Sequence, residues 1–218
     1  MGKVTRIATK PLLLGRPKAF DPEQALDAAL RAFWEKGYEG TSLADLTVAM
    51  DINKPSLYAT FGDKAALFRK VVDHYMRQQS SLWDEAFRLP TAKATVTRIL
   101  ISVADALTSG KNPHGCLLVQ AALSCGEETE CIKNELAARR AESESMIRAR
   151  LLRARAEGEL SRAVDAAALS RFFSTVLRGM SVEASAGATR AQLQSVIDLA
   201  MKAWPTATKP KQALPTEI

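Results

Sequence analysis

TSLADLTVAMDINKPSLYATFGDKAALF, residues 41–68, is the stretch that decides the fold. Its spacing predicts two short helices joined by a tight turn, with a third helix starting directly after them. Ser42, with Asp45 three residues later, matches a capping box at the start of the first helix. Asn53 is a favoured N-cap for the second helix, and Pro55 falls in its first turn, where a missing N–H removes no hydrogen bond. The stretch therefore predicts a helix-turn-helix whose second helix has a polar N-terminus.

Most of the remaining chain also has a helical pattern. Apolar residues recur every three or four positions, and no alternating strand pattern is present. The sequence predicts an all-α protein with a three-helix head (residues 20–66) and a larger helical body (residues 67–204), joined by a long helix that starts after Asp63. We expect a flexible basic N-terminal arm at residues 1–19 and a disordered tail at residues 205–218.

The composition is that of a soluble globular protein, with 47% hydrophobic and 25% charged residues. No apolar run approaches the roughly 18 residues that a membrane span needs, which predicts a cytoplasmic protein without a membrane partner. The net charge is +6, yet residues 21–78 hold nine acidic and seven basic residues. Bulk charge therefore does not predict nucleic-acid binding, which would depend on the arm and on a few placed groups.

Several classes of active or metal site are absent from the sequence. The chain has no G-x-S-x-G, phosphate-loop or H-E-x-x-H motif, so we predict no enzyme and no cofactor. Its cysteines include no Cys-x-x-Cys pair, which argues against a structural zinc site or a disulfide framework. These cysteines are Cys116, Cys125 and Cys131.

The second helix of the turn motif is suited to enter a DNA major groove. Backbone N–H groups and small polar side chains at helix starts can bind phosphates. The candidates are Thr41 and Ser42 at one helix start and Asn53, Lys54 and Ser56 at the other. The side chains that could reach base edges are Lys54, Pro55, Ser56, Tyr58, Ala59 and Thr60. In the arm, Arg16 and Lys18 could enter a minor groove or contribute only counterion release.

The segments T-S-L-A-D-L, N-K-P-S-L-Y-A-T-F and G-D-K-A-A-L-F resemble the N-terminal domain of TetR/AcrR-type transcriptional regulators, over about residues 20–78. This resemblance implies a ligand-responsive repressor that binds a palindromic double-stranded DNA operator as a homodimer. It implies that Lys54, Tyr58 and Lys64 contact the DNA backbone and that Pro55 and Ser56 lie near the bases. The residues alone also allow Tyr58 to be a partly buried surface aromatic and Lys64 to be a solvated helix start.

A dimer is also expected on physical grounds, because one small head reads few base pairs and a two-fold pair reads a palindrome. The last two helices carry apolar stripes at helical spacing, which suits a four-helix interface or the chain's own core. The predicted interface residues are Val176, Leu177, Ala184, Leu193, Val196, Ile197, Ala200 and Trp204.

The middle helices carry large apolar side chains that could enclose an unknown small-molecule effector or simply fill the core. The predicted pocket residues are Trp83, Phe87, Cys116, Met146, Phe172, Phe173 and Met180. Cys116 follows His114 at a helix start, so it could be a redox- or electrophile-sensing thiol of such a repressor, or a small buried apolar residue. A helical protein-binding scaffold without specific DNA binding would explain the apolar stripes, but not the polar start of the second head helix.

Overall fold

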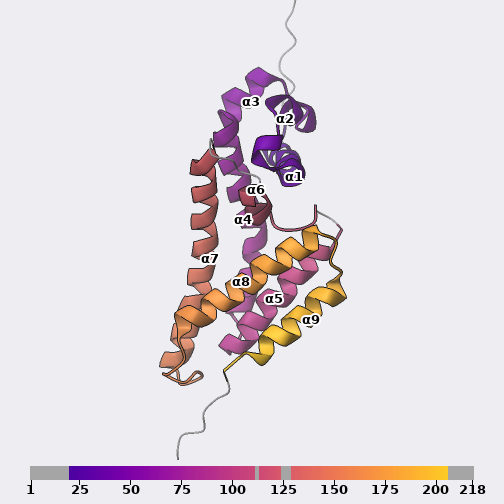
Figure 1. Ribbon diagram of the computed structural model, residues 1–218. Coiled ribbons are helices and arrows are strands. Elements are labelled where there is room, and N and C mark those ends of the chain that lie inside the picture. Colours follow the sequence, from indigo (N-terminus) through magenta and orange to yellow (C-terminus); the bar gives the residue numbers. More distant parts are fainter. Residues whose placement is uncertain (1–19, 111–112, 124–128, 206–218) are drawn as a thin grey trace, which may run out of the picture.

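The computed structural model describes residues 20–110, 113–123 and 129–205. Within these ranges the regular elements are helices and no strand is present, which confirms the all-α prediction. The helices are α1 (Pro22–Gly40), α2 (Leu43–Ala49), α3 (Lys54–Phe61), α4 (Lys64–Phe87), α5 (Ala92–Thr108), α6 (Leu117–Leu123), α7 (Glu130–Ala156), α8 (Ala166–Ser185) and α9 (Arg190–Lys202) (Figure 1).

Two predictions fall partly outside these ranges. The arm with Arg16 and Lys18, and the predicted tail from residue 206 onward, lie outside the described residues, as does Cys125. Among the described helices, none is both long and apolar enough to cross a bilayer.

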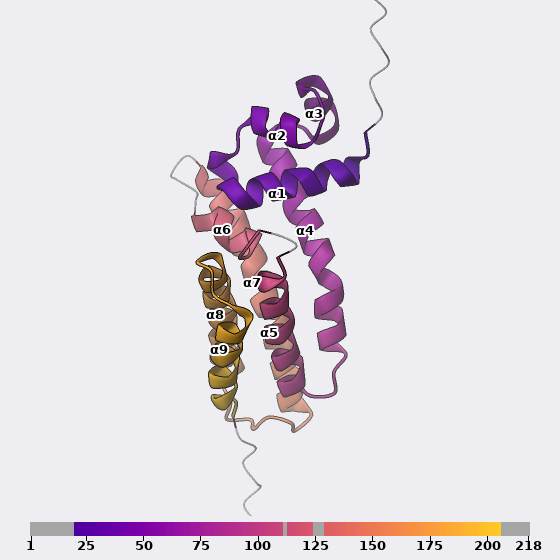
Figure 2. The ribbon, with the colours of Figure 1, turned by 90° about the vertical axis from the view of Figure 1, so that its right-hand side faces the viewer.

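The head occupies one end of the molecule, where α1 lies across the upper part of α4 and α2 and α3 cap that end (Figures 1 and 2). The long helix α4 runs from the head down one side of the body, as the sequence predicted. The lower part of the body is formed by α5, α7, α8 and α9, and α6 lies between this group and α1.

Local cap chemistry sets the helix boundaries of the head. The Ser42 hydroxyl accepts the Asp45 N–H at 3.0 Å while Asp45 accepts the Ser42 N–H at 2.9 Å, which confirms the predicted capping box. Asn53 accepts the Ser56 N–H at 2.8 Å and begins α3, as predicted. At Gly37 the chain leaves helical geometry (φ 71°, ψ 176°), although a glycine often ends a helix, and then makes one more turn to Gly40.

Two hydrophobic cores hold the molecule together. The first joins α1–α3 to the upper part of α4, and Phe33, which is fully buried, packs edge-on against Phe68 with ring centroids 5.0 Å apart. This core continues into α6 through Leu117 and into α7 through Leu136, so the head is packed directly on body helices. The second core lies between the lower part of α4 and helices α5, α7, α8 and α9, with Phe173 fully buried in it.

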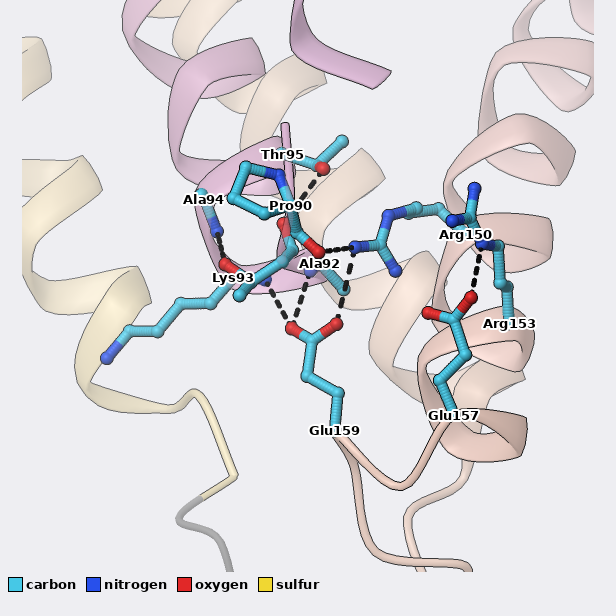
Figure 3. Close-up of polar contacts among 10 residues, drawn as sticks. Pro90, Ala92, Lys93, Ala94, Thr95, Arg150, Arg153, Glu157 and Glu159 are labelled. Atoms are coloured by element: carbon cyan, nitrogen blue, oxygen red, sulfur yellow. Dashed lines mark hydrogen bonds and ion pairs between the residues drawn. The ribbon is translucent and has the colours of Figure 1, made fainter. Parts of the chain in front are cut away.

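A buried polar cluster ties the start of α5 to the end of α7 (Figure 3). The Glu159 carboxylate accepts the N–H groups of Ala92 at 2.5 Å and Lys93 at 3.3 Å. Its other oxygen pairs with Arg150 at 3.3 Å, and Arg150 also donates to the Pro90 carbonyl at 3.1 Å. Arg150 is only 5% exposed, so this cluster holds a cation inside the body.

Candidate nucleic-acid interface and ligand cavity

One side of helix α3 is buried in the head core and the other side is exposed to solvent. Leu57 and Phe61 are buried in the head core, and Phe61 lies 6.0 Å from the Phe20 ring. The side chains between and before these anchors face solvent; they are those of Lys54, Pro55, Tyr58, Ala59 and Thr60. Tyr58 is 44% exposed, so its ring is a surface aromatic whose hydroxyl is free to reach outward. The predicted DNA-contacting residues from Lys54 to Thr60 therefore lie together on one exposed helix.

The N-terminus of α3 has the electrostatics of an anion site. Its first turn contains no acidic side chain, and Lys54 is its first residue. The Ser56 N–H is bonded to the Asn53 side chain and Pro55 has no N–H, so an anion would meet the Lys54 N–H, the positive end of the helix dipole and the lysine side chain. In α2, by contrast, the Asp45 carboxylate occupies the first turn, where hydrogen bonds from Lys36 at 2.5 Å and from Ser42 hold the pKa of Asp45 well below its usual range.

The predicted phosphate contact by the Thr41 side chain is wrong for this geometry. Thr41 is fully buried, and its hydroxyl donates to the carbonyls of Gly37 at 2.7 Å and Ala32 at 3.2 Å. It therefore fastens the end of α1 rather than facing outward. Ser42 is exposed, but its hydroxyl is engaged with Asp45, so a phosphate would compete with the capping box.

Lys64, at the start of α4, has a partner that the sequence did not indicate. Its ammonium lies 4.6 Å from the centroid of the Tyr38 ring, a cation–π contact. Partial burial lowers the pKa of Lys64, and the nearby Glu39 carboxylate opposes that shift. The contact positions the charge at the border of the head, and backbone contact with DNA by Lys64 stays a prediction.

A cavity of about 250 Å³ lies where α1 meets the body. Its wall is mostly apolar and draws on six helices, including Trp34 from α1 and Tyr75 from α4. Of the predicted pocket residues, Trp83, Cys116 and Met146 line it. Leu177, which was predicted for the dimer interface, is also part of the wall.

The other predicted pocket residues lie elsewhere, which corrects that part of the pocket prediction. Phe87 stacks on the Trp83 ring, with ring centroids 6.1 Å apart, and is not in the wall. Phe173 and Met180 are sealed in the second core, at 0% and 1% exposed. Phe172 is 40% exposed on the outside of α8. The helical pattern identified these side chains as apolar but could not assign them to a wall, a core or an outer face.

The loop before α6 presents Cys116 to the cavity. The Tyr75 hydroxyl donates to the Cys116 sulfur at 3.4 Å, and the Cys116 N–H donates to the Ser181 hydroxyl at 2.8 Å. Burial raises the pKa of Tyr75 well above its usual value, so this hydroxyl remains a donor. Gly115 has φ +87°, and a Cβ there would meet the Ser181 carbonyl at 3.1 Å, so the loop depends on glycine.

The predicted dimer residues divide into two groups. Four of them are buried within the single chain, namely Ala184, Leu193, Ile197 and Ala200. Their assignment to the interface is corrected, because a side chain that fills its own core has no surface to offer a partner. Val176 and Trp204 are half-buried, and the ring centroids of Trp204 and Phe173 lie 5.7 Å apart.

Exposed apolar side chains on α8 and α9 lie beside these buried ones. Val196, predicted for the interface, is 40% exposed, and Val182 and Leu199, which the sequence reasoning missed, are 41% and 65% exposed. Phe172 lies on the same outward side of α8 as Gly179, where the surroundings are open. We define the outer face as Phe172, Val182, Val196 and Leu199.

The comparisons with known proteins agree with this architecture. Two protein-family models match the chain. The family model for bacterial regulatory proteins, tetR family, matches residues 25–71, and the family model for the tetracyclin repressor-like C-terminal domain matches residues 92–200. The HTH-type transcriptional repressor ComR of Escherichia coli (strain K12) is 34% identical over 200 residues, covering 89% of this chain and 94% of that protein. The repressor BdcR of the same strain is 50% identical over 62 residues, covering 28% of this chain and 32% of that protein.

A solved structure extends the similarity to three dimensions. It contains a cysteine mutant of the TetR family transcriptional regulator CifR, complexed with 26 bp double-strand operator DNA. That chain is 42% identical to this one, with a TM-score of 0.84, and the match covers 87% of this chain and 100% of that chain. The chain therefore belongs to the tetR family of bacterial regulatory proteins.

Proposed function

We propose that this regulator is a repressor that binds a palindromic DNA operator as a homodimer and changes its DNA affinity when a small molecule fills the cavity. The proposal rests on the two sides of α3. Lys54 and Tyr58 are exposed, while Leu57 and Phe61 are buried in the head core. A helix held by two buried side chains, with a lysine and no acidic side chain in its first turn, suits the major groove. ComR is a repressor and CifR was solved on operator DNA, which supports the same role here.

The cavity is placed to influence the head. Trp34 and Tyr75 belong to the first core and also to the cavity wall, and their rings pack edge-on with centroids 5.1 Å apart. A ligand that displaces these rings acts on α1 and α4 together, and so on the spacing of the two heads in a dimer. Such a ligand shifts the population between DNA-binding and non-binding geometries, and typical couplings of about 1–3 kcal/mol change affinity roughly 5–150-fold.

The test of the proposed function is binding to selected DNA. Duplexes selected by the protein from a random pool are titrated beside scrambled duplexes, across a range of salt concentrations. We expect a palindromic consensus, preference for it over scrambled DNA, and a log–log salt slope of about −0.9 for each phosphate contacted. Equal, weak binding to both duplexes would instead favour the helical scaffold.

Substitution of Leu199 by aspartate tests the dimer. We expect Leu199→Asp to raise the dimer dissociation constant by at least about tenfold, because Leu199 is the most exposed side chain of the outer face and a charge there would be buried in the interface. Sedimentation velocity measures this change, and Val48→Asp is the control, since Val48 is an 82% exposed apolar residue on α2 of the head. If Leu199→Asp remains as dimeric as Val48→Asp, the outer face is not the interface.

A second candidate is a thiol-based version of the same repressor, favoured by the position of Cys116 in the cavity wall. Iodoacetamide measures thiol reactivity, because the thiolate displaces iodide and forms a carbon–sulfur bond after the thiol has released its proton. We expect Cys116, followed by peptide mass spectrometry, to react faster at pH 7 than free cysteine. The exposed Cys131 of the same chain is the internal reference. A Cys116 rate no faster than that of free cysteine would reject this candidate.

A further inference from the structure

The cavity wall contains a cation that forms no ion pair with any described carboxylate. The Arg140 guanidinium, on α7, is partly buried and lines the cavity. Its hydrogen bond is to the Leu118 carbonyl at 2.6 Å, and no described carboxylate forms an ion pair with it. Burial lowers the pKa of Arg140 and the like charge of Arg178 adds to that effect, whereas negative charge on the nearby Cys116 sulfur opposes it.

The other charged groups of the wall leave Arg140 uncompensated. Arg178 pairs with Glu144 at 3.7 Å, and Glu144 also holds Arg171 at 3.3 Å. Asp84, on α4, also belongs to the wall, but its side chain is exposed and forms no ion pair with Arg140. A partly desolvated cation with only a neutral acceptor is unfavourable, and an incoming anion would remove that penalty.

The rest of the wall defines the remainder of the ligand. Trp34, Trp83, Leu107 and Met146 supply apolar surface, and the volume of about 250 Å³ lies near the lower limit of cavities that hold drug-sized molecules. Two polar atoms of wall residues, Trp34 Nε1 and Ser174 Oγ, have no hydrogen-bond partner among the described residues, but both are shielded from the cavity and therefore do not define the ligand.

We propose that the effector is a small organic anion, an apolar body with one carboxylate, whose carboxylate pairs with Arg140. Its body contacts the Trp34 and Trp83 side of the wall, and Trp34 transmits its presence to α1. This proposal names the ligand class of the cavity and rests on the function proposed above. Its chemistry differs from the thiol candidate because no covalent bond forms.

The test compares acids with their uncharged amides by calorimetry on the full-length protein without DNA. The probe pairs are naphthalene-2-acetate with naphthalene-2-acetamide, decanoate with decanamide, and benzoate with benzamide. We expect at least one acid to bind at least about tenfold more tightly than its amide, the scale of a charge-assisted hydrogen bond. The proposal is overturned if no acid binds, or if every amide binds as well as its acid.

Variants of two arginines on the same helix identify the recognising group. We expect Arg140→Gln to abolish the preference for the acid, while Arg140→Lys retains most of it because the charge remains. The matched control is Arg148→Gln, which removes an exposed arginine of α7 and should leave both affinities unchanged. An acid preference that survives in Arg140→Gln would overturn the assignment, and retained melting temperatures show that the variants are folded.

DNA titrations with the same acids separate this inference from the proposed function. Acids that bind through Arg140 and also change operator affinity support both. Acids that bind through Arg140 without changing operator affinity support the anion site and argue against ligand-responsive repression.

Discussion

Replacing Lys54 and Tyr58 together with alanine is expected to weaken operator binding by at least about a hundredfold. The two side chains stand on the exposed side of α3, so a bound dimer would lose four contacts to DNA. Hydrogen bonds to charged groups contribute roughly 1.5–3 kcal/mol each, which makes a hundredfold loss a conservative value. The salt slope should also fall by about one for each lysine–phosphate contact removed. Fluorescence anisotropy on a labelled operator measures both quantities.

The matched control for this variant is Lys93→Ala. Lys93 is an exposed lysine at the start of α5, in the body, and its removal changes the net charge by the same amount as removal of Lys54. It should bind the operator almost as the unmodified protein does. If the Lys54 and Tyr58 double variant is folded and dimeric and still occupies the operator as well as Lys93→Ala, helix α3 is not the reading element.

Removal of the Glu159 carboxylate is expected to cost about 3–5 kcal/mol of unfolding free energy, a large share of the roughly 5–15 kcal/mol typical of a folded protein. Glu159→Ala leaves the buried Arg150 without a counter-charge, held by the Pro90 carbonyl (Figure 3). Two nitrogens of Arg150, Nε and Nη1, already lack hydrogen-bond partners within the described part of the chain. The variant also removes the carboxylate oxygen that accepts hydrogen bonds from the N–H groups of Ala92 and Lys93.

Urea denaturation at a fixed protein concentration measures this loss. The control is Glu157→Ala, which removes an exposed ion pair with Arg153 at 2.8 Å and should change stability by no more than about 1 kcal/mol. Replacing Arg150 by methionine in the Glu159→Ala background should recover much of the loss, because the uncompensated charge is then gone. Equal effects of Glu157→Ala and Glu159→Ala would show that the buried cluster does not stabilise the body.

The parts of the fold that the sequence predicted are those governed by local chemistry. Ser42 and Asn53 specify their helix starts through hydrogen bonds to N–H groups two or three residues away, so a short window contains the whole cause. Leu57 and Phe61, four residues apart and therefore on one side of α3, are both buried, and this spacing also lies within a short window. Gly37 shows the limit of such local signals. A glycine often ends a helix, yet the chain makes one more helical turn after Gly37.

The long-range features were not predictable from periodicity alone. The stripe of α8 and α9 contains core residues such as Ile197 beside exposed ones such as Leu199, and both satisfy the same spacing. Many of the charged side chains of α7 are exposed, but Arg140 lines the cavity and Arg150 is buried. A signal was present, because both fall in helical register with Leu136 and Ile147, which are buried. Trp34 was missed because a residue of the head core was not expected to line a cavity of the body as well.

The most direct test of the account is hydroxyl-radical footprinting of the protein on a selected palindromic duplex. The account predicts that two copies of α3 enter successive major grooves on one face of the DNA, with centres about 34–36 Å apart or a multiple of that distance. The footprint should therefore show two symmetric protected patches, and both should disappear with the Lys54 and Tyr58 double variant. A single patch, continuous protection without symmetry, or protection that survives in the double variant would contradict the account.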